Sequence, residues 1–125
     1  MLLDFYRDVL PAQGQYCLFI LPERRHLWVD SLDKLAEAST KLAPRQGVYF
    51  ATSAFIEPTK RTQTNVLSLK SLRLDIDAGP AKFAKHGDKV YATQQDALRA
   101  VVKFSRAITL APSYIVSSGH GLHLY

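Results

Sequence analysis

The sequence predicts an α+β fold, with an amino-terminal αβ unit over residues 1–57 followed by a βαββ unit over residues 58–125. Three observations support this prediction. The chain has 125 residues, enough for one domain with a sizeable core but not for two. Hydrophobic residues make up 47% and charged residues 22%, as in folded globular proteins. Short runs of branched and aromatic residues alternate with apolar patterns of helical spacing.

The first 57 residues are expected to supply packing and support. Their patterns predict a short helix ended by Pro11, a two-stranded hairpin, a helix capped by Asp30 or Ser31, and a third strand. In order, these elements are expected over residues 2–10, 15–21, 26–29, 31–42 and 47–52. Residues 53–65 are polar and are predicted to form a long loop or an irregular strand edge, and long loops are often functional in compact domains.

The second unit is predicted to open with a strand over residues 72–77, stopped by Gly79 and Pro80. Thr93 resembles a helix cap, and Pro112 ends the helical region. Two strands follow, over residues 113–117 and 121–125, joined by a turn. One set of helix residues has the spacing of a buried stripe: Ala97, Leu98, Val101, Val102, Ser105 and Ile108. A second set forms a basic stripe that is usually solvated: Arg99, Lys103 and Arg106.

Composition excludes several classes of protein. No apolar run approaches the ~18–20 residues that span a bilayer, so no membrane partner is expected. The amino end carries Asp4, Arg7 and Asp8 and lacks the pattern of a secretory signal. Cys17 is the only cysteine, which excludes an internal disulfide and a multi-cysteine zinc site. A reducing cytoplasm is the expected location.

The first strand of the second unit carries a pair of acids. Side chains two apart on a strand share a face about 6.5–7 Å apart, so Leu72, Leu74 and Ile76 are expected to face the core. Asp75 and Asp77 then share the other face with Arg73, where their charges repel unless a cation lies between them. Such a pair, with substrate phosphates, suits Mg²⁺. Taken alone, however, this pattern is more often two solvated acids.

The carboxyl end carries a second set of polar residues. Glycines at 119 and 121 bound a turn whose backbone N–H groups can approach an anion, and Ser118 adds a hydroxyl donor. His123 alternates with two leucines, so it faces away from the core. A lone histidine on a strand is more often packed or solvated. The turn beside it favours a phosphate-binding role.

Charge is unevenly distributed between the two units. The net charge is +5. Residues 1–57 hold six Lys or Arg against seven Asp or Glu, whereas residues 58–125 hold ten against four. The basic excess therefore lies in the half that carries the acids, which favours a phosphate-bearing ligand.

The sequence Leu74-Asp75-Ile76-Asp77, followed about 45 residues later by Ser-Gly-His-Gly-Leu-His at residues 118–123, resembles the archaeo-eukaryotic primase superfamily. The closest resemblance is to primase or primase-polymerase domains of bacteriophages and plasmids. It implies the primase fold, with an RRM-like second unit, and metal-dependent nucleotidyl transfer from NTPs or dNTPs to make primers on a DNA template. It also implies a bacterial or phage-infected cytoplasm.

Carried over residue by residue, the resemblance assigns Asp75 and Asp77 to catalytic Mg²⁺ or Mn²⁺, and His123 to catalysis through the nucleotide phosphates. It implies that the turn lies against the triphosphate, and Lys82 is a further candidate phosphate ligand. The turn residues concerned are Ser118, Gly119, His120 and Gly121. The implied partners are single-stranded DNA, an NTP or dNTP, and a helicase.

One departure from the family leaves alternatives open. The third acidic motif of the family follows the histidine motif, but here no Asp or Glu follows Asp96. The chain is therefore expected to be a catalytic domain truncated before that motif. The alternatives are a catalytically incomplete DNA-binding replication module and, less favoured, a relaxase-type rolling-circle nuclease. The nuclease needs two histidines alternating on one strand, whereas His120 and His123 are three residues apart.

Overall fold

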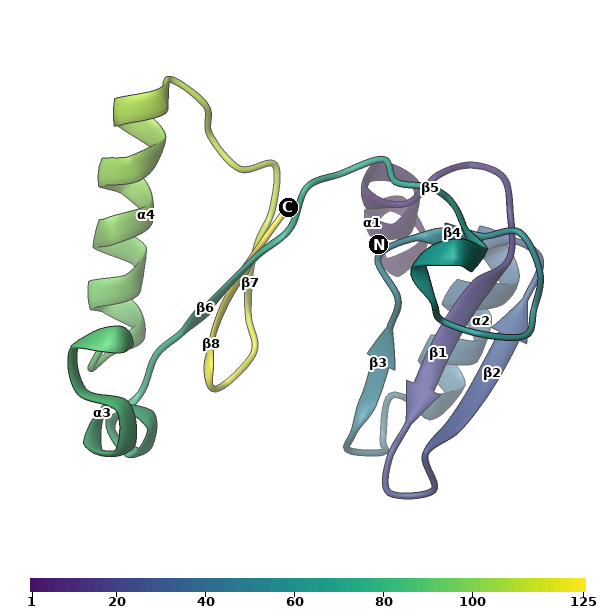
Figure 1. Ribbon diagram of the computed structural model, residues 1–125, viewed down its shortest axis with the longest axis horizontal. Helices are drawn as coiled ribbons and strands as arrows, with labels where there is room; N and C mark the ends of the chain where they lie inside the picture. The colour runs from purple at the N-terminus through teal and green to yellow at the C-terminus, as the bar shows by residue number, and fades with distance from the viewer. The chain divides into compact units, whose positions relative to one another are not determined.

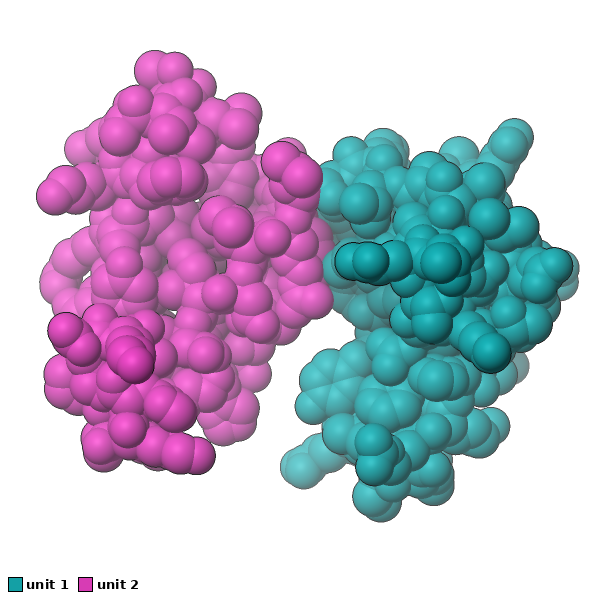
Figure 2. Space-filling view, viewed as in Figure 1, with its two compact units in different colours: residues 1–71 teal, residues 72–125 magenta.

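The computed structural model describes residues 1–125 and divides them into two compact units, Met1–Ser71 and Leu72–Tyr125. Figure 1 shows the helices and strands, and Figure 2 the extent of each unit. The fold is a mixture of helices and small antiparallel sheets, which confirms the predicted α+β class. None of the helices is both long and apolar enough to cross a membrane.

The boundary between the units differs from the predicted one at 57/58. Strand β4 (Ala54–Phe55) pairs with β5 (Val66–Ser68), and this pairing keeps the intervening loop in unit 1. The segment after β5 is also tied to unit 1, because Ser71 Oγ donates a hydrogen bond of 2.8 Å to the Val9 carbonyl. Residues 58–71 therefore belong to the first unit. Strand β5 and the 3₁₀ helix η1 (Gln63–Asn65) were not predicted.

Unit 1 is a three-stranded antiparallel sheet in the order β2-β1-β3, with two helices. The strands are β1 (Tyr16–Ile20), β2 (Arg25–Val29) and β3 (Val48–Phe50), and the helices are α1 (Leu2–Val9) and α2 (Leu32–Leu42). The predicted helices, hairpin and third strand are thus confirmed. Leu18 and its cross-strand neighbour Phe50 face the helices, where the rings of Tyr6 and Phe50 lie 5.3 Å apart. Ser31 caps α2 by accepting a hydrogen bond from the Lys34 N–H.

Cys17 lies in this first unit with 1% of its surface exposed. Burial raises the pKa of its thiol to about 11, against a smaller lowering effect of Arg61. Because the thiolate is the reactive form, Cys17 is expected to be inert to a thiol reagent such as DTNB near neutral pH while the protein is folded. Denaturant should release one reactive thiol per chain. Fast labelling of the native protein would contradict this burial.

Unit 2 has the predicted βαββ order. Its strands are β6 (Leu74–Asp77), β7 (Ile115–Ser117) and β8 (Gly121–Leu124), and its helices are α3 (Pro80–His86), η2 (Gly87–Lys89) and α4 (Gln94–Ile108). The sheet order is β6-β8-β7, and both neighbouring pairs are antiparallel. Strands β6 and β7 therefore run parallel with β8 between them, which is the split βαβ arrangement.

The core of unit 2 is smaller than predicted. Its buried residues are Ala78, Ala97, Val101, Leu122 and Leu124, with Ile76 packed against them. Helix α4 lies against the central strand β8 through Ala97 and Val101. The outer residues of strand and helix are therefore only partly covered, and several predicted core residues are exposed: Leu72 86%, Leu74 50%, Leu98 42%, Val102 42% and Ile108 44%.

Two local signals govern the helices of this unit. The Thr93 hydroxyl caps α4 by accepting a hydrogen bond from the Asp96 N–H at 3.1 Å, which confirms the predicted cap. Helix α3, in contrast, was not predicted, because Gly79 and Pro80 were interpreted only as the stop of the preceding strand. Pro80 occupies its first turn, where the missing N–H of proline costs no hydrogen bond. Pro80 thus ends the strand segment and also begins a helix.

Candidate functional site

The register of β6 and β8 brings the two sequence motifs together. Asp75 lies directly opposite His123, and Asp77 lies opposite Gly121. Residues that face each other across an antiparallel pair project from the same side of the sheet. Asp75, Asp77 and His123 therefore share one face, while the buried Leu122 and Leu124 occupy the other. The structure thus joins residues that are about 45 positions apart in the sequence.

Arg73, Asp75 and His123 form a compact polar cluster on this face. His123 Nε2 lies 3.3 Å from Asp75 Oδ1. Arg73 Nη2 lies 3.9 Å from Asp75 Oδ2 and 3.4 Å from each ring nitrogen of His123. The Asp75 side chain is 60% exposed and that of His123 is 24% exposed. A carboxylate accessible to solvent is therefore flanked by a guanidinium and an imidazole.

Asp77 has a different partner. Lys82, in the first turns of α3, donates a hydrogen bond from Nζ to Asp77 Oδ1. This hydrogen bond is the largest effect and lowers the pKa of Asp77 from its ordinary value; desolvation opposes it, and the charges of Lys82 and His86 add smaller lowering effects. Asp77 therefore keeps its negative charge to lower pH than a free aspartate does. Lys82, expected to be a phosphate ligand, contacts an acid of the site.

The turn before β8 is closed by its own hydrogen bonds. The backbone N–H and the hydroxyl of Ser118 both donate to the Gly121 carbonyl, at 3.0 and 3.2 Å. The His120 carbonyl accepts a hydrogen bond of 3.0 Å from the Ala78 N–H, just after β6. Ser118, Gly119 and His120 are exposed. The turn therefore lies at the same end of the sheet as Asp77.

Gly121 is required by the close approach of β6. A Cβ atom at this position would lie 2.0 Å from the Ile76 carbonyl oxygen, far inside van der Waals contact. The close packing of β6 against β8 therefore requires glycine at position 121. Gly119, with φ of +81°, has nothing within 4 Å of such a Cβ, so its place in the motif reflects turn conformation.

Sequence reasoning gave no role to Arg73 or Tyr125. Tyr125 is 9% exposed, and burial raises the pKa of its hydroxyl, while Arg73 lowers it and Asp75 raises it. Both residues therefore interact electrostatically with the acid-bearing face. The alternation of Arg73 with Asp75 placed it on that face, but its contact with His123 depends on the pairing of β6 with β8.

The donor set of the site fits a hard divalent cation in part. Asp75 and Asp77 supply exposed carboxylate oxygens on one face, the kind of ligand that Mg²⁺ and Mn²⁺ prefer together with substrate phosphates. No group of three or more His, Cys, Asp or Glu side chains is brought together in the chain. Asp75 and Asp77 are the residues that would hold a cation, with oxygens of the substrate completing its coordination.

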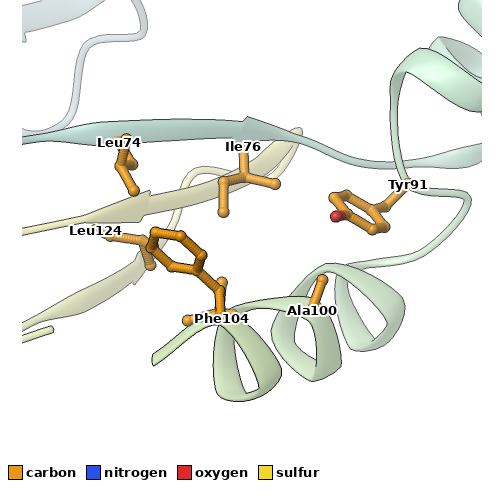
Figure 3. A pocket seen from close by; sticks show the side chains of 7 residues that line it. Leu74, Ile76, Tyr91, Ala100, Phe104 and Leu124 are labelled. Carbon is orange, nitrogen blue, oxygen red and sulfur yellow. The ribbon is translucent and has the colours of Figure 1, made fainter. Parts of the chain in front are cut away.

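An apolar pocket lies on the opposite side of the same sheet (Figure 3). Its lining comes from β6, β8, α4 and the segment just before α4, which supplies Tyr91: Leu74, Ile76, Tyr91, Ala100, Val101, Phe104 and Leu124. It contains no acid or histidine. The polar cluster and this pocket are therefore separate features of unit 2.

Comparison with protein-family models, with curated proteins and with solved structures found no match for this chain. Any functional assignment therefore depends on the geometry of the site.

Proposed function

We propose that this chain is a catalytic domain of the archaeo-eukaryotic primase type, of the kind used in phage or plasmid replication. Its reaction would join an NTP or dNTP to the 3′-hydroxyl of a growing primer on a single-stranded DNA template. The observation that carries the proposal is the placement of Asp75 directly across from His123, with Asp77 on the same face of a split βαββ sheet.

The roles follow from the chemistry of each side chain. A cation held by Asp75 and Asp77 would stabilise charge on the attacking and leaving oxygens. His123 and backbone N–H groups of the turn would bind the outer phosphates, so they would act by positioning and charge stabilisation. Arg73 adds a guanidinium within 3.4 Å of the His123 ring and is well placed to share this task.

The proposal is tested by incubating the protein with a single-stranded template, labelled NTPs or dNTPs, and Mg²⁺ or Mn²⁺. We expect oligonucleotide products that depend on both template and metal. Absence of products with each metal and each nucleotide type, from protein shown to be folded, would reject the catalytic assignment.

A His123→Ala variant is expected to bind nucleotide less tightly, because it removes a positively polarised contact to the triphosphate. A hydrogen bond to a charged group contributes about 1.5–3 kcal/mol, so KM for the nucleotide should rise about tenfold or more while kcat changes less. Steady-state kinetics at varied nucleotide concentration would measure this split. An unchanged KM would remove His123 from the site.

A DNA-binding replication module without catalysis is the second candidate. Two observations favour it, because both weaken a metal site. Asp77 already accepts a hydrogen bond from Lys82, and no third ligating side chain lies beside the two acids. Tight binding of single-stranded DNA by a protein that makes no products would support it. A relaxase-type nuclease is disfavoured because His120 lies in the turn and His123 in β8, so the two do not alternate on one strand.

A further inference from the structure

Unit 1 carries a row of aromatic side chains on the face of its sheet that the helices leave uncovered. Phe19 on β1 lies opposite His26 on β2 and opposite Tyr49 on β3. The alternate residues Leu18 and Ile20 are buried on the other face. Neighbouring strands lie ~4.8 Å apart, so the three residues lie side by side across the sheet.

Part of this row is in ring-to-ring contact, and part of it is open to solvent. The Phe19 and His26 ring centroids are 5.3 Å apart, and Trp28 continues the row along β2 at 6.3 Å from His26. Tyr49 is 55% exposed. His26 and Tyr49 are exposed while Phe19 and Trp28 are half-buried, and exposed rings beside half-buried ones indicate a binding surface.

Arg61 lies across the row. Its guanidinium carbon is 4.5 Å from the Phe19 ring centroid, and its Nε donates a hydrogen bond of 3.0 Å to His26 Nε2. The loop between β4 and η1 thereby lays a planar cation on two of the rings. A stacked guanidinium of this kind can hold a phosphate through its free N–H groups or stack on a base.

The charges of unit 1 favour an anionic ligand on this face. Four cations of the helix layer and the adjoining loops are paired with carboxylates, in the pairs Arg7–Asp33, Lys34–Asp30, Lys41–Glu37 and Arg45–Glu23, whereas Arg24, Arg25 and Lys70 form no ion pair. Lys60 and Arg61 form no ion pair either, and Arg61 is the one that lies on the aromatic row. The loop at residues 56–62 holds these two cations against one acid, Glu57. Positive charge beside stacked rings is the combination used for single-stranded nucleic acids, whose bases stack on aromatic side chains while their phosphates contact cations.

We propose that this face of unit 1, formed by Phe19, His26, Tyr49 and Arg61, binds single-stranded nucleic acid by stacking a base on the open Tyr49 ring and pairing a phosphate with Arg61, which Phe19 and His26 hold in place. The surface is built within unit 1 alone and needs neither metal nor nucleotide. It therefore stands apart from the proposed catalytic function, although it would supply the template contact that such a function requires.

The test is the affinity of the full chain for fluorescently labelled oligo(dT) and oligo(U), measured by anisotropy without divalent cations. Tight binding of either oligonucleotide is the expected result. Tyr49→Leu should weaken binding about tenfold by removing a stacking surface, whereas Tyr49→Phe should preserve it. Arg61→Ala should weaken binding and also reduce the slope of log affinity against log salt by about 0.7, the contribution of one single-strand phosphate contact.

Lys41→Ala is the matched control, because it removes the same charge from α2 in the helix layer. Its affinity should stay within about twofold of the parent, since its charge is already neutralised by Glu37. Circular dichroism would establish that each variant is folded. Binding of neither oligonucleotide, equal affinity for duplex DNA, or an equal loss in Lys41→Ala and Arg61→Ala would overturn the proposal. The binding assay contains no metal and does not depend on catalysis. If the protein binds oligo(dT) but makes no primers, the proposed catalytic function is rejected and the proposed binding surface is retained.

Discussion

An Asp75→Asn variant is expected to lose template-directed synthesis by more than about 100-fold, because even residues that only support metal ligands contribute about 10–100-fold. The change removes one negative charge and keeps the shape of the side chain. It leaves the backbone pairing of β6 with β8 intact, since this pairing is made by main-chain groups. The loss should therefore concern cation binding and not folding.

Asp88→Asn offers a matched control for this variant. Asp88 lies in η2 of the same unit and forms no ion pair, so its substitution makes the same change in net charge without touching β6. We expect it to retain full synthesis. Mn²⁺ binding followed by electron paramagnetic resonance should be weakened by Asp75→Asn and unaffected by Asp88→Asn. Full activity of Asp75→Asn at limiting metal would exclude this residue from the cation site.

A Gly121→Ala variant is expected to lower the free energy of unfolding of unit 2 by about 3 kcal/mol or more, which is at the upper end of the range for single substitutions. The added methyl group would lie 2.0 Å from the Ile76 carbonyl oxygen, which is backbone and can move only if β6 separates from β8. The expected observation is faster hydrogen exchange of the β6 and β8 amides, measured by NMR, together with an earlier urea transition.

Gly119→Ala separates the effect of crowding from that of backbone conformation. Its φ of +81° disfavours alanine by about 1–2 kcal/mol, but the added methyl group would contact nothing within 4 Å. We therefore expect a small loss of stability and preserved strand pairing. Equal effects of the two alanine substitutions would show that the close approach at Gly121 is relaxed in solution.

Local signals in the sequence predicted much of the fold. Thr93 and one of Asp30 and Ser31 were predicted as helix caps, and in the structure Ser31 and Thr93 accept the backbone hydrogen bonds of their helices. These features depend on residues three positions apart, so they can be read from a short window. The segment Pro80–His86 carried a comparable signal, a proline followed by good helix formers, but Gly79 and Pro80 were interpreted only as a strand stop.

Features that depend on distant segments could be predicted only in part. Alternation placed Asp75 and Asp77 on one face, but the pairing of Asp75 with His123 requires the register between strands that lie far apart in the sequence. The contact of Lys82 with Asp77 requires α3, which was not foreseen. The predicted buried stripe of α4 was too wide, because only Ala97 and Val101 are buried where the helix meets β8.

The position of β6 at the outside of its sheet has a consequence for solubility. An outer strand presents backbone donors and acceptors that can pair with another chain and start aggregation. Strand β6 is only four residues long, is followed closely by Pro80, and carries two aspartates among its four side chains. Short length, proline and charge each oppose such pairing. The aspartates proposed to bind a cation therefore also protect this edge against association between molecules.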